Sequence, residues 1–188
     1  MAEALAGDFS PSGKLPLTFY KSVDQLPPFE NYDMEGRTYR YFSGEPLYPF
    51  GYGLSYATIA FSNLRFDKSS LGASDDLTAT VDVQNTGKVA SDEVVELYLA
   101  HPGVDAAPIR SLAGIRRVSL NPGETKSVSI QILNRNLSVV TPNGARKIVP
   151  GQLQVWVGDG QPATRPGLPK PAGIAGSVTI TGSASLPK

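Results

Sequence analysis

Apolar and polar residues alternate over short stretches through most of the chain after residue 57. Alternation with a period of two is typical of a β-strand that buries one face. Turn sequences such as Asn121-Pro122-Gly123 and Pro142-Asn143-Gly144 separate the stretches, with proline and glycine at positions that tight turns favour. The pattern predicts strands at residues 58–66, 77–84, 94–100, 115–120, 127–132, 152–157 and 178–180.

Six to seven short strands with turns between them and no helical period predict a mostly β fold. The closest architecture is a β-sandwich of the immunoglobulin or fibronectin type. We expect this sandwich to occupy residues 57–188.

The first 56 residues have a different pattern. Residues 1–7 read as the last turns of a helix that Gly7 closes in a left-handed conformation, and residues 15–19 read as a short strand. Residues 21–41 are polar and aperiodic, which predicts a long surface loop. We therefore expect a short helix-strand remnant over residues 1–20 and a connector over residues 21–56.

The end of the connector, residues 44–56, combines aromatic residues with two prolines and three glycines. Such a segment does not propagate a helix, because proline lacks a donor and glycine costs about 1 kcal/mol in a helix interior. Its rings need another surface to cover them. We predict that this segment docks one body on another through Tyr48, Phe50, Tyr52 and Tyr56.

Composition excludes several classes of function. The 188 residues carry 17 basic and 17 acidic side chains, so no charged surface for nucleic acid or an anionic membrane is expected. The sequence has no apolar run long enough to cross a bilayer, and its first ten residues do not resemble a signal peptide. With no cysteine and one histidine, His101, we expect neither a metal site nor a cofactor.

Several stretches occur in a fixed order along the second half of the chain. They are residues 81–87, 92–99, 112–118, 120–124 and 149–158. In sequence and order they resemble the fibronectin type III-like domain that ends many family 3 glycoside hydrolases. Residues 7–16 resemble the end of that family's α/β sandwich domain, and residues 37–41 are similar to the connector of its β-xylosidase-like and β-glucosidase-like branch.

The resemblance implies a part of a retaining β-glycosidase. Such enzymes place two carboxyl groups about 5 Å apart across the sugar. In this family the nucleophilic Asp and the acid/base Glu lie upstream of the matching region, so no catalytic residue is assigned here. The resemblance also implies upstream catalytic domains as partners and a periplasmic or secreted parent enzyme, although the sequence by itself leaves the localisation open.

Four residues are candidates for contact with β-linked saccharides. Arg37, Tyr39 and Tyr41 could border a sugar subsite of the catalytic body, or pack on the α/β domain. Trp156 falls on the polar face of its strand, where an exposed indole serves either as a platform for sugar stacking or as the cover of a domain seam.

Three functions compete. The first is a non-catalytic portion of a β-glucosidase or β-xylosidase that braces the catalytic domains. The second is a freestanding module that binds carbohydrate or protein. The third is a small esterase-like hydrolase that uses loop residues such as His101 and Asp105. The aromatic connector further predicts self-association when its partner body is absent.

Overall fold

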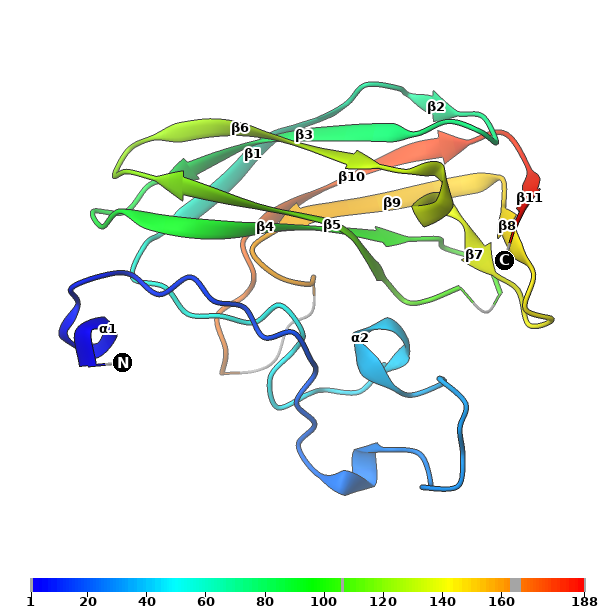
Figure 1. Ribbon diagram of the computed structural model, residues 1–188, viewed down its shortest axis with the longest axis horizontal. Coiled ribbons are helices and arrows are strands. Elements are labelled where there is room, and N and C mark those ends of the chain that lie inside the picture. Colours follow the sequence, from blue (N-terminus) through cyan, green and yellow to red (C-terminus); the bar gives the residue numbers. More distant parts are fainter. Residues whose placement is uncertain (1, 106, 163–166, 188) are drawn as a thin grey trace.

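A computed structural model describes residues 2–105, 107–162 and 167–187. A β-sandwich forms the body of the molecule, and residues 2–56 run along one side of it (Figure 1). The mostly β fold expected from the alternating pattern is confirmed. No helix among the described residues is long and apolar enough to span a membrane.

The strands form three sheets. A three-stranded sheet has the order β1-β3-β6, a five-stranded sheet has the order β2-β10-β9-β4-β5, and a small sheet has the order β11-β8-β7. All pairs are antiparallel except β10 with β2. The strands are β1 (Ile59–Phe66), β2 (Ser70–Leu71), β3 (Leu77–Asn85), β4 (Ser91–Ala100), β5 (Ser111–Leu120), β6 (Thr125–Ile132), β7 (Val139–Val140), β8 (Arg146–Ile148), β9 (Gly151–Gly158), β10 (Gly173–Ile180) and β11 (Ala184–Leu186).

The core lies between the two larger sheets. Alternate residues of β3 are buried, and their apolar side chains meet those of β4, β6, β9 and β10 in one cluster. Leu77, Leu97 and Leu153 are fully buried there. Full burial of a side chain of this size is worth about 1.5–3 kcal/mol. Leu153, Val155 and Val157 of β9 lie in this cluster, which confirms the alternation predicted for residues 152–157.

Two turns show why glycine occurs where it does. Gly7 follows helix α1 (Ala2–Ala6) with a φ of 87°, and its N–H donates to the Ala4 carbonyl, as expected for a left-handed helix end. Gly123 has a φ of 77° in the turn between β5 and β6, where the Glu124 N–H donates to the Asn121 carbonyl. Both conformations disfavour any residue with a Cβ.

The expected strand at residues 15–19 is wrong. This segment makes only one isolated bridge, between Phe19 and Tyr48. Pro16 has no N–H to donate, and Leu17 and Phe19 are exposed, so the segment has neither a continuous ladder of hydrogen bonds nor the buried face of a strand. Residues 21–41 also contain two short helical turns, η1 (Val23–Gln25) and α2 (Thr38–Tyr41), within the expected loop.

The alternating pattern did not reveal β2, β7, β8 and β11, which have two or three residues each. The short 3-10 helix η2 (Asn134–Leu137) leads into β7 and buries Leu137. Strands this short have no measurable period and depend on neighbours distant in sequence. An example is the pairing of Ser70 with Thr179.

Candidate functional site

The connector covers part of the outer face of the five-stranded sheet, which is the face turned away from the core. Gly51 donates its N–H to the Leu15 carbonyl, and Leu15 donates its N–H to the Tyr52 carbonyl, both at 2.9 Å. Pro49 and Gly51 are buried. A Cβ on Gly51 would collide with the Glu96 carboxylate of β4. We use the name joint for residues 49–53 and the outer-face residues of β4 and β9 that they cover.

Three aromatic rings fix the joint from one side. Tyr39 stacks on Phe50, with ring centroids 4.3 Å apart and an angle of 26° between the planes. The same Tyr39 ring meets Tyr98 of β4 edge to face at 6.0 Å. Its hydroxyl accepts a hydrogen bond from the backbone N–H of Leu112 in β5, at 3.1 Å. Tyr39 therefore links the connector to two neighbouring strands.

A cluster of charged groups lies at the other side of the joint. The ammonium of Lys14 lies 3.0 Å from Oε1 of Glu93, and the exposed fractions of these side chains are 11% and 4%. Glu96 is also buried, and its Oε2 accepts a hydrogen bond from the Tyr98 hydroxyl at 2.5 Å. Asp159, just after β9, interacts electrostatically with the same lysine. The ammonium of Lys14 thus interacts with three carboxylates.

Burial dominates the protonation behaviour of this cluster. Loss of hydration raises the pKa of Glu93, Glu96 and Asp159 above their ordinary values, while Lys14 opposes the rise in each case. Burial also raises the pKa of the Tyr98 phenol, and the negative charge of Glu96 adds to this effect. Tyr98 is therefore the proton donor in its bond to Glu96 at ordinary pH.

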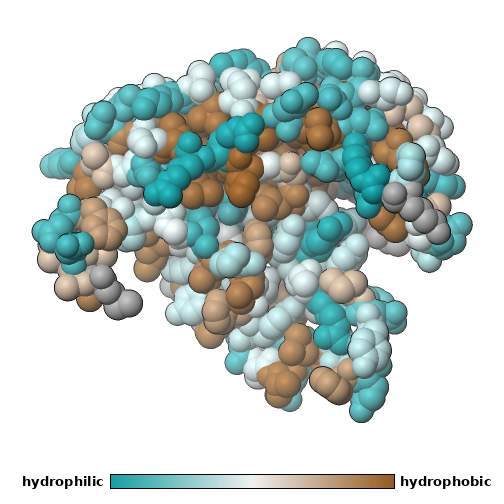
Figure 2. Space-filling view, in the orientation of Figure 1, coloured by the Kyte–Doolittle hydropathy of each residue, from teal (hydrophilic) through white to brown (hydrophobic). Residues whose placement is uncertain are grey.

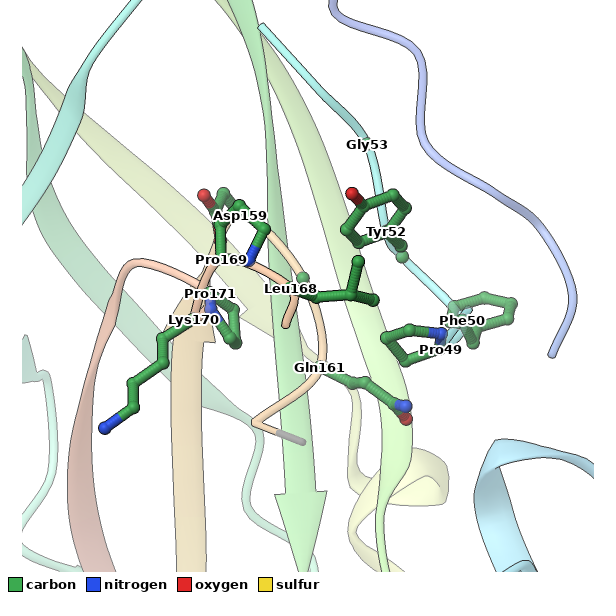
Figure 3. Close-up of a pocket in the computed structure, with 12 residues that line it drawn as sticks. Pro49, Phe50, Tyr52, Gly53, Asp159, Gln161, Leu168, Pro169, Lys170 and Pro171 are labelled. Carbon is green, nitrogen blue, oxygen red and sulfur yellow. The ribbon is translucent and has the colours of Figure 1, made fainter. Parts of the chain in front are cut away.

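A small cavity lies beside the joint, between the connector and the segment after β9 (Figure 3). Phe50, Tyr52, Leu168, Asp159 and Gln161 are among the residues that line it, and Tyr52 lies close to Leu168. Its volume is about 50 Å³. Small-molecule sites have volumes of about 300–1,000 Å³, so this cavity accommodates a few water molecules rather than a sugar.

The four predicted docking residues have different environments. Phe50 and Tyr52 are half-buried within the joint. Tyr48 lies at the edge, 36% exposed, against Phe19 and Tyr52. Tyr56 is 50% exposed and donates its hydroxyl to the Ala4 carbonyl. The connector therefore covers part of its aromatic surface with this chain's own sheet and leaves the rest on the surface.

The four residues predicted to contact saccharides do not lie together in the structure. Arg37 donates hydrogen bonds to the carbonyls of Asn31 and Asp33 and so organises its own loop. Tyr39 belongs to the joint, and Tyr41 lies beneath the guanidinium of Arg40. Trp156 lines a separate hollow on the sheet and is half-buried rather than exposed. Arg37, Tyr39 and Trp156 line three different hollows.

His101 lies just after β4 and is half-buried, which lowers the pKa of its imidazole. Within the described part of the chain, no hydrogen bond joins its ring to a carboxylate or a hydroxyl. The same residues include no cluster of three or more histidine, aspartate or glutamate side chains placed to hold a metal ion. We therefore take the joint as the candidate site.

Residues 23–34 of the connector loop present a second surface. Its apolar side chains are unusually exposed: Phe29 by 90%, Tyr32 by 89% and Val23 by 76%. Figure 2 shows hydrophobic residues on the lobe below the sandwich, which Figure 1 draws in blue and cyan. A patch of this kind is typical of a surface that another protein body covers.

The sequence pattern did not predict the buried acids. Residues 94–100 appeared apolar on both faces, yet this stretch contains Glu96, and Glu93 immediately precedes it. A charged residue within a central strand is itself a signal, because such groups are rarely buried without a partner. The partner, Lys14, lies about eighty residues earlier and could not be identified from spacing.

Substitutions of Tyr39 test how much its ring contacts contribute to stability. Replacing Tyr39 with phenylalanine keeps the stack but leaves the Leu112 N–H without its acceptor, so we expect a loss of about 1 kcal/mol in the free energy of unfolding. Replacement with alanine also removes the ring contacts, and we expect about 2 kcal/mol. Urea denaturation measures both values. Equal losses would contradict a contribution from the rings.

Comparison with known proteins identifies the class. The fibronectin type III-like domain matches residues 93–161, and the glycosyl hydrolase family 3 C-terminal domain matches residues 1–56. The chain therefore combines part of a family 3 C-terminal domain with a fibronectin type III-like domain. It is the C-terminal portion of a family 3 glycosyl hydrolase of the β-glucosidase and β-xylosidase type.

Individual relatives support this assignment. A xylan 1,4-β-xylosidase from Xylanibacter ruminicola is 35% identical over 84% of this chain, and a periplasmic β-glucosidase from Salmonella typhimurium is 36% identical over 84%. The structure of β-glucosidase 3B from Thermotoga neapolitana, in complex with α-D-glucose, matches 98% of this chain with a TM-score of 0.83 and 29% identity. The chain spans 18%, 22% and 27% of these proteins, respectively.

Proposed function

We propose that this chain is the non-catalytic part of a β-glycosidase and braces the catalytic domains for the hydrolysis of β-glucosides or β-xylosides. The joint is the observation that carries this proposal. Tyr39 holds the connector on the sheet through its ring contact with Tyr98 and its hydrogen bond with Leu112. Backbone hydrogen bonds fasten Leu15 to the connector, and a buried ion pair joins Lys14 to Glu93, so the link is built as a rigid one rather than a flexible linker.

The exposed surface of residues 23–34 supports the same proposal. Phe29 and Tyr32 extend from a loop whose other end is fixed at the joint. A rigid joint therefore presents these side chains in a defined position to the remaining domains. We further propose that residues 1–20 complete the α/β domain, that residues 21–56 form the connector, and that residues 57–188 form the sandwich.

A chimera of the Thermotoga neapolitana enzyme tests the bracing role. Residues 1–188 replace the matching 27% of that enzyme, and hydrolysis of an aryl β-glucoside is compared with that of the enzyme truncated before the replaced portion. We expect the chimera to be active and the truncated enzyme to be inactive. A chimera that unfolds cooperatively but is no more active than the truncated enzyme would contradict the proposal.

The isolated chain provides the control. We expect it to hydrolyse neither aryl β-glucosides nor aryl β-xylosides, and to associate with the truncated enzyme in size-exclusion chromatography. Hydrolysis of an aryl ester that is lost in His101→Ala would instead favour the small-hydrolase alternative. Absence of association, together with an inactive chimera, would leave a freestanding binding module as the better description.

A further inference from the structure

A hollow of about 470 Å³ lies on the outer face of the five-stranded sheet, next to the joint and separate from it. Its volume falls within the range of small-molecule sites, about 300–1,000 Å³. The hollow forms because the strand positions that face outward here carry short side chains, among them Ala100, Ala175 and Ser177. Trp156 and Arg110 lie at its border.

Trp156 is held in one orientation. Its ring Nε1–H donates to the Gly160 carbonyl at 2.9 Å, so the polar atom of the indole is satisfied within the protein. The ring lies against Gly173 of β10, where a Cβ would collide with it. A fixed aromatic surface binds a flat apolar partner at a low cost in conformational entropy. The apolar faces of a pyranose ring match such a surface.

Arg110 supplies a positive charge at the border of the hollow. The guanidinium is half-buried, and Nη1 donates to Oε1 of Gln161 at 3.1 Å. Gln161 is a neutral, buried side chain that follows Gly160, so one short segment fixes both Trp156 and Arg110. Ion pairs among the described residues do not include Arg110. A guanidinium with free N–H donors is suited to a carboxylate, which it can bind through two parallel hydrogen bonds.

We propose that this hollow binds an acidic saccharide, that is, a pyranose ring bearing a carboxylate, as in a uronic acid. The ring stacks on Trp156 and the carboxylate pairs with Arg110. The side chains of Gln154 and Ser177, which also line the hollow, offer hydrogen-bonding groups to the hydroxyls. The proposal does not depend on the bracing role, because the hollow is formed by this chain alone.

Intrinsic fluorescence tests the proposal directly, because Trp156 is the only tryptophan in the chain. The full chain is titrated with methyl β-D-glucuronide and, separately, with methyl β-D-glucoside, which lacks the carboxylate. We expect a saturable change in emission with the glucuronide and at least tenfold weaker binding of the glucoside. Equal affinities, or no saturable change with the glucuronide, would overturn the proposal.

Two arginine variants locate the carboxylate. We expect Arg110→Gln to remove the preference for the glucuronide, whereas Arg116→Gln, which alters an exposed arginine of β5, leaves it unchanged. A preference that survives in a folded Arg110→Gln chain would contradict the assignment. The salt dependence of the wild-type chain is a test without a variant: added sodium chloride should weaken binding of the glucuronide and not that of the glucoside. Identical salt dependences would also overturn the proposal.

Discussion

Replacing Lys14 with methionine is expected to lower the free energy of unfolding by about 3 kcal/mol at neutral pH. Methionine keeps the apolar stem of the lysine but leaves Glu93, of which 4% of the side chain is exposed, without its cation. Removing one partner of a buried ion pair is strongly destabilising, because the remaining charge has lost both water and its counterion. Denaturation in urea measures the loss.

The expected loss depends on pH. Burial raises the pKa of Glu93, Glu96 and Asp159, so the folded chain holds protons that the unfolded chain releases. Their contribution to stability is present below the unfolded pKa, ordinarily 4.5 for glutamate, and is lost as the pH rises through the folded pKa. Lys14 limits this loss by favouring the ionised forms. The difference between the wild type and Lys14→Met should therefore be smallest near pH 4 and grow toward neutral pH.

Lys126→Met is the matched control. Lys126 pairs with Glu124 at 3.1 Å, but the two side chains are 44% and 31% exposed, and exposed pairs contribute little. We expect little change in stability at any pH. Equal destabilisation by the two substitutions, or a Lys14→Met effect that does not vary with pH, would show that the buried carboxylates do not depend on Lys14.

Replacing Gly51 with alanine is expected to cost about 3 kcal/mol and to release the connector from the sheet. Gly51 has a φ of 77°, a conformation that costs a residue with a Cβ about 1–2 kcal/mol. The new Cβ would also collide with the Glu96 carboxylate and approach the Tyr98 hydroxyl, so the hydrogen bond between these residues would be disturbed. Overpacking of this kind costs about 1–3 kcal/mol.

Hydrogen exchange of the backbone amides measures the release. The N–H groups of Leu15 and Gly51, which bond between residue 15 and the connector, should exchange faster in Gly51→Ala, while those of β3 remain protected. Gly103→Ala distinguishes the cost of the backbone conformation from the cost of the collision. Gly103 has a φ of 75° but no neighbouring atom within 4 Å of the point where a Cβ would lie. If both variants lost the same stability, the collision with Glu96 would contribute nothing.

The sequence predicted the sandwich well, because strands depend on a local property. Alternation in residues 77–84 and 152–157 identifies which side chains face the core, and β3 and β9 follow it. The positions of Gly7 and Gly123 were also predictable from the sequence, because a left-handed backbone conformation favours glycine. The expected strand at residues 15–19 was wrong because the few hydrogen bonds that Leu15 and Phe19 make with the connector do not form a continuous ladder, which a local apolar pattern does not reveal.

The candidate site was only partly predictable. The docking role of Phe50 and Tyr52 remains a prediction, and their packing at the joint supports it. Arg37 and Tyr41 were grouped with Tyr39 because they are close in sequence, yet their side chains engage different neighbours. Arg110 was not singled out, because one arginine in a loop gives no sign that it will be half-buried and, among the residues that the structure describes, without an ion pair.

By itself, the sequence determined the class of this protein: a β-sandwich joined to a connector, with motifs ordered as in family 3 glycosyl hydrolases. Only the tertiary structure decided which polar groups are buried. Lys14 meets Glu93, Tyr39 meets Tyr98, and Trp156 borders the same hollow as Arg110. The physical reason is that strand formation follows a local period, whereas the burial and pairing of charges depend on which distant segments the fold brings together.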